Sequence, residues 1–229
     1  MNTREVITTL PEKRLVDLNT YKRRELLEVF LQYDVPFLSA TVEVDITTVR
    51  ECAKNNDLNL FTCLLYCLTK TVNSIPELKH RYINNHLYEF DYIEPGYTVS
   101  QADGTFSFCD SKYVSRFERF HQTILNDIAQ AKESPDTGVK DKSHMFFVSN
   151  IPWISFTHFQ QPFFRPYGFN PVVTIGKHID RDGRRYAPVA LQCHHGTVDG
   201  LHIGLFFNRL EACISQFEQL IDNVEPVFD

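Results

Sequence analysis

The sequence predicts a single compact α/β domain, and three observations support this. Its 229 residues match the length of one domain. Its hydrophobic content of 43%, which includes 19 Phe and 10 Tyr, is large enough for a substantial core. Segments with helical periodicity alternate along the chain with segments that have the patterns of β-strands. We therefore expect residues 1–229 to form one domain.

The first third of the chain is predicted to contain three helices and a strand. Apolar residues recur with helical spacing over residues 20–33. Residues 37–46 alternate as a strand whose even-numbered residues face one way. Residues 47–55 and 60–74 are predicted helices, and the second is apolar on nearly all sides. We expect this second helix to lie in the core.

Predicted strands and helices also alternate in the middle and at the end of the chain. Short aromatic and β-branched runs over residues 82–107 predict a meander of antiparallel strands. Residues 115–132 return to helical periodicity, and the polar residues 133–143 are expected to form a loop. An amphipathic helix is predicted over residues 201–220.

A hairpin is predicted around Asp182-Gly183, a dipeptide typical of two-residue turns. If these two residues form the turn, Thr174 lies opposite Leu191. Because side chains alternate across a strand, this register predicts that Thr174 shares a face with His195. His194 then points to the other face.

Charge and composition argue against several classes of partner. The net charge of -6 and the absence of a long basic stretch disfavour nucleic acid and anionic membranes. The N-terminus lacks the pattern of a secretory signal, and the longest apolar run, residues 58–68, is too short to span a bilayer. The six cysteines form no CxxC pair, so we expect reduced thiols in a cytoplasmic protein without a membrane role.

The clearest candidate site follows the predicted hairpin, where His195 precedes Asp199-Gly200 by four residues. A neutral imidazole at the end of a strand can accept a proton from an attacking hydroxyl group. Asp199 lies where the last helix is expected to begin, so it could serve only as a helix cap. His195 could be structural, or could join His194, Asp199 and His202 in a metal site. The spacing alone leaves these alternatives open.

Several motifs together carry a family resemblance. QCHHGTVDG, followed by an amphipathic helix, resembles the HHxxxDG signature and the C-terminal helix of chloramphenicol acetyltransferases. MFFVSNIPWISFTHF, PVVTIGKH and YTVSQADGTFSF resemble further segments of that family, in the same order. Tyr21-Lys22-Arg23 takes the place of the family's Trp-x-Arg. The similarity extends over nearly the whole chain.

The resemblance implies an acetyl-CoA-dependent O-acetyltransferase that inactivates chloramphenicol without a metal. His195 would be the general base, and Ser149 would donate a hydrogen bond to the oxyanion of the tetrahedral intermediate. Thr174 would hold a water molecule near this intermediate. Asp199 would form a buried ion pair with Arg23 and so order the turn behind His195. For Ser149 the alternative is a hydroxyl group that bonds to the backbone at the end of a strand.

The binding residues are implied by the same likeness. Trp153, Lys177 and His178 would line the coenzyme A channel, with Lys177 as a candidate for phosphate contact. Phe30, Phe106 and Phe164 would offer aromatic surfaces to the nitrophenyl ring. Core packing is an equal alternative for Trp153 and for the three phenylalanines.

The family is a homotrimer with its sites between subunits, and its fold is that of the CoA-dependent acyltransferases. We therefore expect a two-layer sandwich in which helices cover a mixed, largely antiparallel β-sheet. The sequence departs from the family in the acceptor pocket, notably at QQPFFRPYGF after His158. The same chemistry on another hydroxylated xenobiotic or metabolite is therefore an alternative. A non-catalytic trimeric binding protein and a metal-dependent hydrolase are others.

Overall fold

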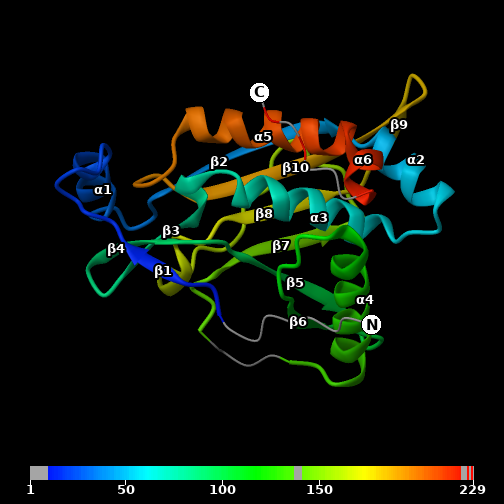
Figure 1. Cartoon of the computed structure of the whole chain (residues 1–229), viewed down its shortest axis with the longest axis horizontal. Helices are drawn as coiled ribbons and strands as arrows, with labels where there is room; N and C mark the ends of the chain where they lie inside the picture. Colours follow the sequence, from blue (N-terminus) through cyan, green and yellow to red (C-terminus); the bar gives the residue numbers. More distant parts are fainter. Residues whose placement is uncertain (1–9, 137–140, 223–225, 227, 229) are drawn as a thin grey trace.

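A computed structural model of the chain describes residues 10–136, 141–222, 226 and 228. Figure 1 shows helices lying over a twisted sheet. The helices are α1 Arg24–Phe30, α2 Thr47–Asn55, α3 Leu60–Asn73, α4 Phe117–Glu133, α5 Gly200–Ser215 and α6 Phe217–Ile221, with short 3₁₀ turns η1 Pro76–Lys79 and η2 Arg165–Tyr167. The strands are β1 Lys13–Leu15, β2 Phe37–Asp45, β3 His80–Ile83, β4 His86–Phe90, β5 Glu94–Ser100, β6 Phe106–Asp110, β7 Met145–Ile151, β8 Val172–Gly176, β9 Ile179–Arg181 and β10 Arg184–His194.

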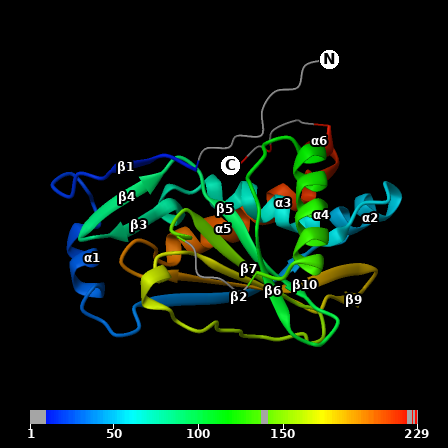
Figure 2. The ribbon, with the colours of Figure 1, turned by 90° about the horizontal axis from the view of Figure 1, so that it is seen from below.

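The main sheet has seven strands and is mixed, which confirms the predicted fold class. Its order is β2-β10-β8-β7-β5-β6, and β9 pairs with β10. The pairs β8–β7 and β7–β5 are parallel, whereas the other pairs in this sheet are antiparallel. The helices gather on one side of this sheet, as the view from below shows (Figure 2).

The core lies between the sheet and its helices. Helix α3 is buried from Thr62 to Val72, as its apolar composition predicts. The predicted helix over 201–220 is interrupted at Gln216, so α5 and α6 are separate, and Leu201 at the start of α5 is 77% exposed. Each fully buried Leu or Phe side chain contributes about 1.5–3 kcal/mol to folding, which makes this layer the main source of stability.

The predicted antiparallel meander over residues 82–107 is only partly correct. Strand β4 pairs with both β1 and β3 in a separate three-stranded sheet, and β5 pairs in parallel with β7. The buried Arg81 of β3 joins the two sheets. Its guanidinium donates to four backbone carbonyls, including those of Met145, the first residue of β7, and of Ser143 just before it. Local strand patterns did not predict these pairings because they depend on contacts distant in sequence.

The hairpin turn at Asp182-Gly183 is confirmed, but the register predicted beyond it is wrong. Both turn residues have positive φ, and Arg181 pairs with Arg184. Ile179 pairs with Tyr186, whereas Ile175 pairs with Val189, so residues 176–178 lie opposite only residues 187–188. This extra residue is a β-bulge, and it shifts the register by one.

The shift changes the face on which Thr174 lies. Thr174 pairs with Ala190 instead of Leu191, and therefore shares its face with Gln192 and His194. The opposite face carries Val173, Leu191 and other residues that pack against the helices. The prediction that Thr174 shares a face with His195 is therefore wrong, because a turn fixes the register only as far as the first bulge.

Three further expectations concern the loop, the cysteines and membranes. The loop predicted over 133–143 includes residues 137–140, which lie outside the described residues, and α4 extends through Glu133. All six cysteines are buried and free. Within the ranges that the structure describes, no helix is long and apolar enough to span a membrane.

Candidate active site

His195 lies just beyond β10, in a turn that fixes its ring. Its backbone N–H donates to the carbonyl of Pro36 at 2.7 Å, and its ring stacks on Phe30 with centroids 4.1 Å apart. Its Nδ1 lies 2.9 Å from the carbonyl oxygen of Val198. Because a carbonyl oxygen only accepts, Nδ1 carries the proton in this bond. The neutral ring then has Nε2 as its free proton acceptor.

The turn is held from behind by Arg23 and Asp199. Nη1 of Arg23 forms an ion pair with Oδ2 of Asp199, and Nη2 lies 3.3 Å from the carbonyl oxygen of His195. The side chains are 13% and 33% exposed, so the pair is only partly buried. Burial acts to raise the pKa of Asp199, but its bonds to Arg23 prevail and the pKa is lowered.

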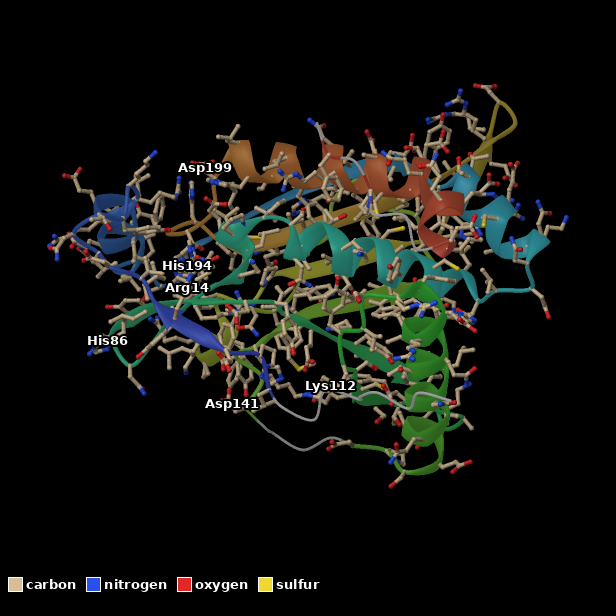
Figure 3. All side chains as sticks on the ribbon, viewed as in Figure 1. Arg14, His86, Lys112, Asp141, His194 and Asp199 are labelled. Carbon is tan, nitrogen blue, oxygen red and sulfur yellow. The ribbon has the colours of Figure 1, made fainter. Side chains whose placement is uncertain are left out.

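Asp199 also caps α5, the helix that follows the turn. Its Oδ1 accepts from the backbone N–H of Leu201 at 3.0 Å. Nδ1 of His202 lies 3.1 Å from the backbone nitrogen of Asp199, which completes a capping box. Figure 3 shows Asp199 at the start of α5, on the side of the molecule that carries α1. The carboxylate therefore serves both as a cap and as the partner of Arg23.

His194 has a different environment from His195. It is 3% exposed and stacks on Phe169, with ring centroids 3.7 Å apart. Its Nδ1 accepts from the backbone N–H of Gly196 at 3.0 Å. Burial and the neighbouring His195 lower its pKa to about 4. In the part of the chain that the structure describes, no three His, Cys, Asp or Glu side chains lie close enough to bind one metal ion.

Ser149 and Thr174 are paired neighbours on β7 and β8, on the sheet face away from the helices. Thr174 is 2% exposed, whereas Ser149 is half-buried. Among the described residues, the Ser149 hydroxyl has no hydrogen-bond partner, which argues against the alternative that it only bonds to the backbone. Since neighbouring strands lie about 4.8 Å apart, one small group could contact both hydroxyls.

A cavity of about 730 Å³ opens beside these strands, within the size range of small-molecule sites. Strands β5 and β7 pair only as far as Tyr97 and Val148, and the cavity follows where the pairing stops. Its walls include Ser149, Phe106, Trp153 and Gln161. Phe164 lines a smaller neighbouring pocket. Phe106 and Phe164 are 53% and 57% exposed, so core packing does not explain either ring.

Trp153, Lys177 and His178 lie near one another. Trp153 is 70% exposed, which rules out its alternative role in core packing. The backbone N–H of Lys177, in the β-bulge, donates to the carbonyl of Ile154 at 2.7 Å. The pKa of His178 is lowered, first by burial and then by the positive charges of Arg185 and Arg50. This end of the sheet therefore offers an exposed aromatic ring beside several cationic groups.

The chain does not bring all the predicted site residues together. His195 follows the end of β10, whereas Lys177 and His178 lie beside its beginning, about 25 Å away at 3.3 Å per residue. The cavity walls include Ser149 but not His195. Phe30 packs on His195 and is likewise absent from the cavity walls. The predicted residues therefore form two groups within one chain.

Two residues beside Ser149 and Thr174, Gln161 and Gln192, were not predicted from the sequence. Nε2 of Gln161 donates to Oγ1 of Thr174 at 3.0 Å, and the backbone N–H of Gln161 donates to Oε1 of Gln192 at 3.1 Å. Gln192 is 7% exposed on a strand that is otherwise mostly apolar. A polar residue at a buried strand position was the available signal, because such groups need partners.

Comparison with known proteins identifies relatives along most of the chain. The family model described as "Chloramphenicol acetyltransferase" matches residues 12–211. A chloramphenicol acetyltransferase from Proteus mirabilis is 32% identical over 200 residues, which cover 86% of this chain and 92% of that protein. One from Clostridium perfringens is 30% identical over 211 residues, covering 89% and 95%.

Solved structures with a similar fold are also found. A chloramphenicol acetyltransferase superimposes with a TM-score of 0.82 at 27% identity, covering 87% of this chain and 98% of that one. A probable dihydrolipoamide acetyltransferase from Listeria monocytogenes has a TM-score of 0.65 at 14% identity, covering 90% and 96%. At that identity the second likeness shows the fold alone.

Proposed function

Because this chain belongs to the chloramphenicol acetyltransferase family, we propose that it transfers the acetyl group of acetyl-CoA to a hydroxyl group of chloramphenicol. The observation that carries the proposal is the hydrogen bond from Nδ1 of His195 to the carbonyl of Val198. It leaves Nε2 able to accept a proton. An alcohol needs such a base because its hydroxyl group is a weak nucleophile at neutral pH.

In the proposed reaction, both substrates bind before any bond changes. Nε2 of His195 takes the hydroxyl proton as the alcohol oxygen attacks the carbonyl carbon of the acetyl thioester. The tetrahedral intermediate carries a negative charge on the former carbonyl oxygen. When it collapses, the carbon–sulfur bond breaks and the CoA thiolate takes the proton back from His195. The products are the acetylated alcohol and free CoA.

Ser149 is proposed to stabilise the oxyanion of this intermediate. Its hydroxyl lines the cavity and is free to donate, which is what an oxyanion donor requires. A donor of this kind contributes about 3 kcal/mol in other acyl-transfer enzymes. Thr174, its partner on β8, would hold a water molecule beside the same oxygen.

Arg23 and Asp199 are proposed to position the base and not to take part in the chemistry. Arg23 contacts both the Asp199 carboxylate and the carbonyl oxygen of His195. Without this pair, the turn between β10 and α5 loses the contact of Arg23 with the carbonyl oxygen of His195. The expected result is a misplaced imidazole at an otherwise folded site.

Acetyl-CoA is proposed to bind where Trp153, Lys177 and His178 gather. The phosphates of CoA are anionic, and the positive charges of Lys177, Arg50 and Arg185 are found together at this end of the sheet. The exposed ring of Trp153 is suited to stack on the adenine or to cover the pantetheine arm. Phe30, Phe106 and Phe164 are proposed to surround the acceptor. No metal takes part in the proposed reaction.

A complete site is proposed to form between copies of the chain in a homotrimer. The separation of His195 from the cavity within one chain supports this, since a neighbouring copy could supply His195 to the cavity that holds Ser149. We also place the enzyme in the cytoplasm, where six buried, free thiols are stable. The polar Gln161 in the cavity wall favours a second candidate, in which the acceptor is a different hydroxylated compound.

The proposal is tested by measuring thiol release from acetyl-CoA with and without chloramphenicol. Release that depends on the drug supports the proposed reaction. Release only with other alcohols would keep the chemistry and reject the acceptor. No release with any acceptor would reject acetyl transfer. Sedimentation of the same sample tests the trimer, which predicts three times the 26.7 kDa mass of one chain.

A further inference from the structure

The amide side chain of Gln161 connects the cavity to one of the proposed site hydroxyls. Gln161 belongs to the segment between β7 and β8 and lines the cavity together with Ser149. Its Nε2 lies 3.0 Å from Oγ1 of Thr174. An amide nitrogen only donates, so the Thr174 oxygen is the acceptor in this bond. The bond therefore leaves the Thr174 hydroxyl proton free to donate to another group.

The position of Gln161 is itself anchored to the sheet. Its backbone N–H donates to Oε1 of Gln192 at 3.1 Å. Gln192 is 7% exposed and lies on β10, opposite Val172 and two residues beyond the partner of Thr174. The Gln161 backbone is thus held by Gln192, on the same sheet face as Thr174, while its side-chain amide bonds to Thr174. Preorganisation of this kind lowers the cost of holding a polar group in one orientation.

Two groups remain free once these bonds are made. The Thr174 hydroxyl has used an acceptor site, so its own proton is available to donate beside Ser149. The carbonyl oxygen of Gln161 has no hydrogen-bond partner among the described residues. The free acceptor lies in the cavity wall, whose other residues are largely aromatic and aliphatic, and the free donor of Thr174 lies directly behind it.

We propose that Gln161 is a positioning and specificity-determining residue, which directs the Thr174 proton toward the reacting groups and selects alcohols that carry a second hydrogen-bond donor. The donor would be an amide N–H close to the hydroxyl that is acetylated, and it would bond to Oε1 of Gln161. This inference rests on the proposed acetyl transfer and goes beyond it by assigning an acceptor class. A site built to bond a donor discriminates strongly against analogues that lack it.

The test is a double-mutant cycle of Gln161→Glu and Thr174→Val, with kcat and KM measured separately. A carboxylate only accepts, so Gln161→Glu keeps the shape of the side chain but turns the Thr174 proton toward itself. We expect each single variant to lose about tenfold in kcat, the equivalent of one hydrogen bond. The double variant should lose no more kcat than either single variant, because both substitutions act through the Thr174 hydroxyl. Gln160→Glu, on the exposed neighbouring residue, is the matched control and should match the wild type.

Acceptor choice gives a second readout. Chloramphenicol is compared with its N-methylated amide, which keeps the reacting alcohol but lacks the N–H donor. We expect kcat/KM to fall about tenfold with N-methylation in the wild type and to change little in Gln161→Met, which has lost the acceptor oxygen. Equal discrimination by the two proteins would overturn the acceptor assignment.

The outcomes separate this inference from the proposed function. Suppose that the wild-type enzyme is active. Additive losses of kcat in the cycle would then overturn the role of Gln161, and so would a kcat of Gln161→Glu equal to that of Gln160→Glu. Either result would leave the proposed acetyl transfer intact. Wild-type protein that releases no thiol with any alcohol would overturn both. Circular dichroism of each variant shows whether a loss reflects unfolding, and Gln161→Met then serves as the second variant.

Discussion

The His195 turn and the cavity beside β7 and β8 are built in opposite ways. In the turn, Nδ1 of His195, its backbone N–H and its carbonyl all have partners, and Asp199 is bonded to both Arg23 and its own helix. In the cavity, the Ser149 hydroxyl and the Gln161 carbonyl have none among the described residues, and Trp153 and Phe106 are exposed. The polar groups of the turn bond within the chain, whereas polar groups of the cavity are free to bond a ligand.

The difference separates positioning from binding. A general base must be held in place before the substrate arrives, so its contacts are internal. Groups that meet a substrate must be free until it binds. Substitutions in the turn should therefore affect both folding and activity, and substitutions in the cavity should affect activity alone.

The largest effect is expected for His195→Ala. Loss of the proton acceptor should lower kcat for chloramphenicol by about 1,000-fold, the middle of the range for general-base catalysis. Thiol release from acetyl-CoA measures it. His86→Ala, an exposed histidine of the β3–β4 hairpin that Figure 3 labels far from Asp199, is the control and should keep full activity. Equal activity of the two variants would remove His195 from the mechanism.

Ser149→Ala should lower kcat by about 100-fold, as expected for one oxyanion donor. Because the hydroxyl makes no bond within the described chain, the free energy of unfolding should stay within about 0.5 kcal/mol of the wild type. Kinetics and urea unfolding on the same sample measure both. Ser155→Ala, in the exposed part of the loop after β7, is the control for kcat. A clear loss of stability in Ser149→Ala would contradict the contrast between the regions.

Arg23→Ala should lower both the stability of the fold and the activity. We expect about 2 kcal/mol loss of unfolding free energy, between the values for exposed and buried ion pairs, and about tenfold lower kcat. Urea unfolding and thiol release measure them. Arg24→Ala is a closely matched control, because the adjacent Arg24 forms an exposed pair with Glu28 and should cost less than about 0.5 kcal/mol. If the two variants unfold alike, the Arg23 pair does not order the turn.

The smallest effect is a pH dependence of stability due to His194. Its folded pKa of about 4 lies below the ordinary 6.5, so between these values the unfolded chain binds a proton that the folded chain excludes. Stability is therefore complete above pH 6.5 and falls as the pH drops toward 4. His194 should account for about 2 kcal/mol between pH 7.5 and pH 5.

His194→Asn tests this assignment, since its amide oxygen can accept from Gly196 but does not titrate. Urea unfolding at the two pH values should show a shallower decline than in the wild type. Some decline should remain, because burial also lowers the pKa of His80, His121, His144 and His178. An unchanged decline would mean that His194 does not contribute.

Sequence reasoning succeeded where structure is local. The helix over residues 47–55, the turn at Asp182-Gly183 and the cap at Asp199 follow from periodicity and from the chemistry of single residues. It failed where partners are distant in sequence. No local sequence pattern indicates that β5 pairs in parallel with β7, or that Gln161 bonds to Thr174.

The residues of the candidate site divide in the same way. The turn of His195 could be predicted, because Asp199 and Gly200 mark the start of a helix. The face on which Thr174 lies could not be predicted, since it depends on the bulge at residues 176–178. Neither could the separation of His195 from the cavity, which depends on the three-dimensional path of β10.

The bulge has a consequence for how the chain can vary in length. Gly176 lies where a Cβ would come within 2.6 Å of both Phe156 and Pro188, so the backbone is already at its closest approach there. Deleting one residue of 176–178 would restore the turn's register and exchange the two faces of β8, turning the Thr174 hydroxyl into the core. Deletions at the hairpin tip, in contrast, leave β8 unchanged. Homologous sequences should therefore tolerate gaps at residues 181–184 but keep the spacing between Thr174 and Ile179 fixed.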